Sequence, residues 1–268
     1  MRRAVVAAVV LALAGAASEA PAPTAADERP LLLRDVGLAP RPGNRLPLDA
    51  VFRDEAGEAA PLGRWLEGRP VVLSLVYFGC PMLCGEIMNA LTTSLKPIAL
   101  EPGKDFTVLA VSFDPRDRPE AARAKKAAAI ARYGRPGAAW GWHFLTGDAE
   151  AIRRLTDAVG FRYTWDAAGA QFAHVAVVTV LTPDGRIARY FPGIEYPARD
   201  LRLALVEASE GRIGTVVDRL LLFCYRYDAA SGRYTPMIAR AVRVGAALTV
   251  LALGGLIVML RRQERKAT

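Results

Sequence analysis

The chain has 268 residues, 52% of them hydrophobic, with a formal net charge of +8 and a mean hydropathy of +0.18. This composition excludes a disordered chain and a small disulfide-stabilised domain. The charge is concentrated at the ends, because residues 1–20 carry +1, residues 240–268 carry +5 and the residues between them carry only +2. A basic surface for nucleic acid is therefore not expected on the body of the protein.

The N-terminal end has the pattern of a secretory signal peptide over residues 1–20. Arg2 and Arg3 precede an uncharged apolar run of 12 residues, Ala4–Gly15, and small residues follow it. An uncleaved anchor is the alternative, but the run is shorter than a bilayer requires. Residues 21–44, which begin with a Pro- and Ala-rich stretch, are expected to form a flexible leader.

The C-terminal end predicts a transmembrane helix over residues 240–261. Val244–Leu260 is a run of 17 residues without a charge, and at 1.5 Å per residue it reaches about 25 Å. A buried core helix is the alternative, but a terminal helix that is apolar on all sides has no second layer to cover it. Basic residues follow, so the tail 262–268 is expected in the cytoplasm. The two ends then agree on one topology, with the body outside, the short tail inside, and 211–239 as a juxtamembrane segment.

Residues 45–210 are expected to form one α/β domain. Strands are predicted at Leu48–Phe52, Val71–Phe78, Phe106–Phe113, His143–Thr146, Phe172–Thr182 and Arg186–Phe191. Helices are predicted at Pro61–Leu66 (a short turn), Cys84–Leu100, Pro119–Tyr133, Asp148–Val159 with Asp148 as N-cap, and Pro197–Ser209. This order predicts parallel strands with crossover helices and a final antiparallel pair, which is the thioredoxin-like arrangement with a central mixed sheet.

Two of the three cysteines, Cys80 and Cys84, lie where the first buried strand is expected to pass into a helix. Sites on open α/β sheets are usually found there, and a helix N-terminus stabilises a thiolate. Their i, i+4 spacing would put both sulfurs on one helical face, as a dithiol metal clamp or a somewhat strained disulfide. Three alternatives fit less well. Buried apolar cysteines are not expected at such a position. Thioredoxin-type pairs have two intervening residues, and peroxiredoxins have Thr where this chain has Tyr77.

The chain has two histidines. His174 is expected at the start of the strand Phe172–Thr182, close to where thioredoxin-like redox enzymes have a cis-proline, and no proline occurs between Pro136 and Pro183. Two thiolates and one imidazole suit copper as Cu(I) or Cu(II), and zinc fits the same three ligands. A half-buried strand histidine is the alternative for His174. His143 is expected to be structural.

Several short motifs together resemble the Sco/SenC family of copper chaperones over roughly residues 45–210. They are residues 77–84 (YFGCPMLC), 111–117 (VSFDPRD) and 144–147 (FLTG), and His174 followed by 183–185 (PDG). The resemblance implies a thioredoxin-like fold that binds one copper ion through Cys80, Cys84 and His174. It also implies that Asp114, which matches an acidic position of the family, acts on the site electrostatically or from outside the ligand set.

The resemblance further implies a role in assembling the dinuclear copper centre of cytochrome c oxidase subunit II. Two departures from the family are Gly85, where a proline is common, and the C-terminal position of the anchor, which resembles longer bacterial members. The main hypothesis is a membrane-tethered metallochaperone on the periplasmic side of a bacterial inner membrane, whose partners are subunit II or its assembly factors. Whether the chain is also an enzyme stays open between this hypothesis and the next. No nucleic acid is expected as a partner.

The alternative function is a thiol–disulfide oxidoreductase that keeps the cysteines of the oxidase copper site reduced. Cys80 and Cys84 would then be catalytic, and His174 would be an electrostatic neighbour. A redox sensor fits less well, because the eight residues after Leu260 are too few for a cytoplasmic domain. The third cysteine, Cys224, is expected to be a buried or interfacial thiol; pairing between molecules, or reaction with the other two cysteines, is the alternative.

Overall fold

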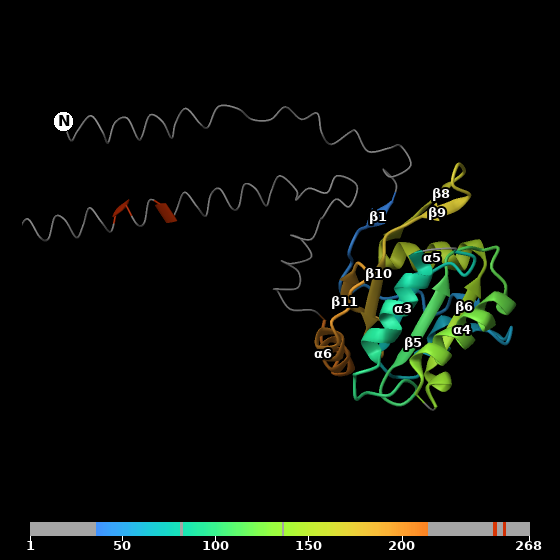
Figure 1. Ribbon diagram of the computed structural model, residues 1–268, viewed down its shortest axis with the longest axis horizontal. Helices are drawn as coiled ribbons and strands as arrows, with labels where there is room; N and C mark the ends of the chain where they lie inside the picture. The colour runs from blue at the N-terminus through green and yellow to red at the C-terminus, as the bar shows by residue number, and fades with distance from the viewer. Residues whose placement is uncertain (1–35, 81–82, 136, 214–248, 251–253, 256–268) are drawn as a thin grey trace, which may run out of the picture.

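The computed structural model describes residues 36–80, 83–135, 137–213, 249–250 and 254–255 (Figure 1). The predicted signal peptide, the leader up to residue 35, the juxtamembrane segment beyond residue 213 and the tail lie outside these residues. Of the predicted transmembrane helix, only 249–250 and 254–255 are described, and both pairs are helical. No helix within the described ranges is long and apolar enough to cross a membrane.

A mixed sheet of seven strands forms the centre of the domain, in the order β11-β10-β4-β5-β6-β2-β3. Its parallel part consists of β4 (Val71–Val76), β5 (Thr107–Ser112) and β6 (Trp142–Gly147). The antiparallel strands are β10 (Val177–Leu181) and β11 (Ile187–Pro192) at one edge, and β2 (Val51–Arg53) and β3 (Ala59–Pro61) at the other. The predicted central mixed sheet is confirmed.

Between residues 36 and 213, the described part of the chain forms four α-helices and two short 3-10 helices around the sheet. They are α3 (Leu83–Leu95), α4 (Pro119–Tyr133), α5 (Ala149–Val159) and α6 (Ala198–Ser209), with η1 (Leu62–Trp65) and η2 (Ala138–Gly141). α3 contacts both α4 and α6. The predicted bounds of α4 are confirmed, and Asp148 caps α5 as predicted, since its Oδ1 accepts a hydrogen bond of 2.8 Å from the Ala151 amide.

The strands β4 and β5 form the hydrophobic centre of the molecule. Every residue of both strands is buried, which explains why their sequences are near-continuous apolar runs. Each fully buried valine or leucine side chain in such a core stabilises the fold by about 1.5–3 kcal/mol. The paired ladder from Val71–Thr107 to Val76–Ser112 therefore gives a rigid base for the residues that follow its carboxyl end.

The predicted long strand Phe172–Thr182 is wrong, because the structure divides it. β9 (Gln171–Ala173) pairs with β8 (Thr164–Asp166) in a separate two-stranded hairpin, which projects away from the main sheet in Figure 1. Residues 174–176 belong to no strand, and β10 begins at Val177. The run around His174 is apolar on both sides, so hydrophobicity alone does not reveal this interruption.

Part of the segment that the sequence analysis assigns to the leader lies against the domain. β1 (Gly37–Leu38) pairs antiparallel with β7 (Phe161–Arg162), two short strands that the sequence analysis does not predict. The Ala39 amide donates to the Gly160 carbonyl at 2.8 Å. The Arg41 amide donates to the Tyr190 hydroxyl at 3.0 Å. These bonds hold residues 37–41 on the body of the fold.

The glycines that end α5 and α4 offer a matched test of this contact. Gly160 and Gly134 have φ of +75° and +70°. A β-carbon on Gly160 would lie 1.9 Å from the Ala39 carbonyl oxygen, whereas the nearest atom to one on Gly134 is 3.9 Å away. We expect Gly134→Ala to lower the free energy of unfolding by about 1–2 kcal/mol, the cost of the left-handed backbone. Gly160→Ala should cost more, because it also displaces the Ala39 segment. Urea unfolding measures both, and equal losses would contradict the assignment of that segment to the folded domain.

Candidate metal centre

Cys80 lies in the turn that follows the central strand β4. Its amide donates to the Tyr77 carbonyl at 3.3 Å, and its side chain is half-buried against the core. The described part of α3 begins at Leu83, and Cys80 itself is not helical. Residues 81–82 lie outside the described part of the chain, so the expected i, i+4 geometry of the pair stays a prediction. Cys84 lies in the first turn of α3, and its side chain is outside the described part of the chain.

Asp117 holds the turn that carries Cys80. Its Oδ2 accepts one hydrogen bond of 2.6 Å from the Phe78 amide and another of 2.6 Å from the Ser112 hydroxyl. The β4–β5 ladder ends at Val76 and Ser112, so the carboxylate provides an acceptor for a backbone amide just beyond it. Asp117 belongs to the motif 111–117, but its role is not visible in the sequence, because the amide that it binds is 39 positions away.

His174 lies in the connection between β9 and β10, among aromatic side chains. Its ring centroid is 5.1 Å from that of Phe113 and 6.0 Å from those of Tyr77 and Phe161. Burial lowers the pKa of His174 below the ordinary value of 6.5, and the hydrogen bond to the Val175 carbonyl opposes this shift. The imidazole is therefore neutral at pH 7, the state in which histidine binds metals.

The hydrogen bond of His174 also decides its tautomer. Nδ1 lies 2.9 Å from the Val175 carbonyl oxygen. A carbonyl only accepts, so Nδ1 carries the hydrogen and the lone pair of the neutral ring is on Nε2. Metal-binding histidines commonly use this arrangement, with one nitrogen on the metal and the other donating to a backbone carbonyl.

Tyr77 connects the two candidate ligands. Its ring contacts the ring of His174, and its carbonyl accepts from the amide of Cys80. The structure thus brings Cys80 and His174 to the same end of the sheet. Within the described residues, which leave out the Cys84 side chain, no three histidine, cysteine, aspartate or glutamate side chains are grouped closely enough to hold a metal ion. The ligand set of Cys80, Cys84 and His174 stays a prediction.

Asp114 is paired with Arg116. Asp114 is only 5% exposed. Its Oδ1 accepts from the Arg116 Nε at 2.8 Å, and its Oδ2 accepts from Nη2 at 2.8 Å. This bond raises the pKa of Arg116 above its usual value. The charge of Asp114 is therefore balanced locally, and its expected electrostatic effect on the metal stays a prediction.

His143 lies away from the candidate site. It is near the amino end of β6, whereas Cys80 follows the carboxyl end of β4, and the two strands belong to one parallel set. Burial lowers its pKa below 6.5, while the nearby carboxylate of Glu55 opposes the shift. Only His174 of the two histidines is thus at the end of the sheet that carries Cys80.

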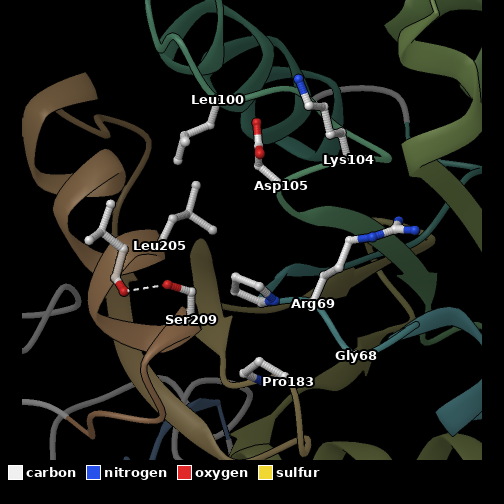
Figure 2. A pocket seen from close by; sticks show the side chains of 10 residues that line it. Gly68, Arg69, Leu100, Lys104, Asp105, Pro183, Leu205 and Ser209 are labelled. Carbon is white, nitrogen blue, oxygen red and sulfur yellow. Dashed lines mark hydrogen bonds between the residues drawn. The ribbon is translucent and has the colours of Figure 1, made fainter.

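A hollow of about 350 Å³ lies at the opposite end of the sheet, beside the residues that precede β4 and β5 (Figure 2). Three of its polar side chains have partners within the chain. Arg69 pairs with Glu67 at 2.6 Å. Asp105 accepts from the Glu101 amide at 2.8 Å, and the Ser209 hydroxyl donates to the Val206 carbonyl at 2.7 Å. We therefore place the candidate site at the Cys80 end.

The model of the family described as SCO1/SenC matches residues 52–207, more than half of the chain. Two solved structures of proteins from Aquifex aeolicus VF5 are similar over most of their length. One, a proposed electron transfer protein, is 32% identical with a TM-score of 0.56, covering 64% of this chain and 96% of its own. The other, a proposed electron transport protein, is 30% identical with a TM-score of 0.52, covering 63% and 99%.

Arabidopsis thaliana ScoI, solved with copper bound, has the same fold. It is 16% identical with a TM-score of 0.51, and the match covers 64% of this chain and 99% of that protein. None of the curated proteins compared with the chain matches it. Given the match to the family model and the 32% identity to the first Aquifex aeolicus protein over nearly its whole length, the chain belongs to the SCO1/SenC family.

Proposed function

We propose that the chain is a copper metallochaperone that binds copper through Cys80, Cys84 and His174. The observation that carries this proposal is the orientation of His174. Its Nδ1 is held by the Val175 carbonyl, and its ring lies against Tyr77, which is bonded to the Cys80 turn. Family membership and the copper-bound structure of Arabidopsis thaliana ScoI support the choice of metal.

The donor set suits copper in both oxidation states. Soft thiolates favour Cu(I), and an imidazole added to them also suits Cu(II). Cys80 is half-buried and not enclosed, so an incoming ligand of a partner can approach it. Copper then passes to the partner by stepwise exchange, in which each new ligand displaces an old one.

The proposed recipient is the dinuclear copper site of cytochrome c oxidase subunit II, reached directly or through an assembly factor. We propose that the helix at 240–261 tethers the domain to the periplasmic face of the inner membrane. Such a tether confines the domain to the plane that holds the oxidase, which raises its effective concentration there.

The position of Cys80 also favours a second candidate function, a thiol–disulfide reductase. Cys80 lies just before the N-terminus of α3, where the helix dipole stabilises the thiolate that attacks a disulfide. In this reaction the thiols of Cys80 and Cys84 would give two electrons and two protons to a partner disulfide. A bond would form between the two cysteines, and the partner would leave with two thiols.

Copper titration of the full chain tests the ligand set. We expect Cys80→Ser, Cys84→Ser and His174→Ala each to weaken Cu(I) binding in a chelator competition, because each removes a donor atom. Removing a residue that only hydrogen-bonds to a metal ligand lowers metal affinity by about 10- to 100-fold. Removing a ligand itself should lower the Cu(I) affinity by at least as much. Cys224→Ser and His143→Gln are matched controls that remove the same side-chain types elsewhere, and they should bind like the parent. Parent-like binding by all three ligand variants would overturn the proposal.

A disulfide-exchange assay separates the two candidate functions. The reduced full chain is mixed with an oxidised peptide that contains one disulfide, and the peptide thiols released are measured over time. If the chain is a metallochaperone, His174→Ala should bind copper more weakly, because the imidazole is a copper ligand. This loss should occur whether or not the variant still exchanges disulfides with the peptide. An absence of exchange in the parent would exclude the reductase. Rapid exchange by a parent that does not bind copper would exclude the metallochaperone.

A further inference from the structure

The loop between β5 and α4 contacts both segments that carry the described candidate ligands. Two adjacent residues of this loop, Arg116 and Asp117, point to different neighbours. Asp117 bonds to the Cys80 turn, and Arg116 packs on the β8–β9 hairpin, which leads directly to His174. One short loop thus lies between two segments that are far apart in the sequence.

The contact of Asp117 is made of hydrogen bonds. The Phe78 amide, two residues before Cys80, donates to Oδ2 at 2.6 Å, and the Ser112 hydroxyl donates to the same oxygen at 2.6 Å. Ser112 is the last residue of β5, in the buried centre of the sheet. Asp117 therefore fixes the Cys80 turn relative to the buried centre of the sheet.

The contact of Arg116 is made by stacking. The guanidinium carbon lies 4.5 Å from the ring centroid of Trp165 and 5.5 Å from that of Phe172. These two residues are directly opposite each other in the hairpin, with ring centroids 4.9 Å apart. A cation over aromatic rings is attracted to them, and a planar guanidinium also stacks on them. Because Phe172 is two residues before His174, Arg116 holds the hairpin close to the candidate ligand.

The loop itself is internally fixed. Asp114 binds the Arg116 guanidinium through both carboxylate oxygens, and its Oδ1 also accepts from the Arg116 amide at 2.9 Å. The Asp117 amide donates to the Asp114 carbonyl at 3.1 Å, and the Asp114 amide donates to the Ser112 hydroxyl at 3.1 Å. The contact of Arg116 with the hairpin and the contact of Asp117 with the Cys80 turn therefore come from adjacent residues. The bonds within the loop restrict how these two residues can move relative to each other.

Strand pairing with the main sheet does not position the β8–β9 hairpin, so other contacts must hold it against the domain. Among the described strands, β8 and β9 pair only with each other. The Phe172 ring contacts Tyr77 and Phe113 on the inner side, at centroid distances of 5.3 and 5.6 Å. Arg116 adds to these ring contacts a charged, planar group that is itself fixed by Asp114.

We propose that Arg116 and Asp117 are positioning residues that set the spacing between the Cys80 turn and His174. This inference rests on the proposed copper site. Asp117 acts through the Phe78 amide, and Arg116 acts through the stacked pair of Trp165 and Phe172. Neither residue binds the metal.

The test uses the full chain loaded with Cu(I) in a chelator competition and with Cu(II) for spectroscopy. We expect Arg116→Ala and Asp117→Ala to weaken Cu(I) binding by about 10- to 100-fold. The thiolate-to-Cu(II) absorption band and the electron paramagnetic resonance spectrum should shift, because the donor geometry changes. A purely structural role would lower stability without moving these spectra. Arg153→Ala and Asp157→Ala remove an exposed ion pair on α5, 3.4 Å long, and serve as matched controls with parent-like behaviour.

Conservative variants separate geometry from charge. Asp117→Asn keeps an oxygen acceptor for the Phe78 amide and loses the charge, so it should restore most of the affinity and the parent spectrum. Arg116→Lys keeps the charge but cannot stack as a planar group or bind Asp114 through two nitrogens, so it should not. Thermal unfolding shows whether each alanine variant folds. If one does not, the conservative variant at the same position is used in its place to test the inference.

Parent-like copper affinity and spectra in folded Arg116→Ala and Asp117→Ala would overturn the inference. It would also be overturned if Arg116→Lys fully restored the copper affinity while Asp117→Asn restored none of it. Failure of the underlying copper site is recognised separately. In that case Cys80→Ser and His174→Ala would themselves bind copper like the parent. If those two variants lose copper while the loop variants keep it, only the positioning role is wrong.

Discussion

The carboxylate of Asp117 accepts two short hydrogen bonds where the central strand pair ends, and the candidate site is built on this point. One bond comes from the last residue of β5 and the other from the backbone just beyond β4. Main-chain pairing stops there, and an unsatisfied amide next to a buried core would cost free energy. A side chain from the following loop takes over from the ladder, so the Cys80 turn leaves the sheet in one defined direction.

Much of the fold could be predicted, because its strongest signals are local. The buried runs of β4 and β5, the bounds of α4 and the Asp148 cap all depend on residues close in sequence. The pairing of β1 with β7 could not be predicted from two-residue strands, since so short a segment has no period. The division at His174 was missed for another reason. Pairing partners, not hydrophobicity, decide where β9 ends and β10 begins.

The site could be predicted in its residue types and only partly in its support. Cys80 and His174 stand out because few side chains share their chemistry, and the structure places both at one end of the sheet. Asp117 did not stand out, because its main-chain partner is 39 positions away in the sequence. Arg116 was likewise hidden, since its aromatic partners lie on a hairpin that the sequence pattern did not show. Long-range contacts of this kind require the folded chain.

The hairpin that precedes His174 has a consequence for how such proteins diversify. Residues 167–170, which join β8 to β9, are exposed, and the main sheet continues without them. Loop tips of this kind tolerate insertions and substitutions at little cost to stability. The outer shape of the molecule beside the candidate ligand can therefore vary while the cysteine turn and the histidine stay in place. Related proteins can therefore differ in contour on this side of the molecule and still keep the same candidate ligand side chains.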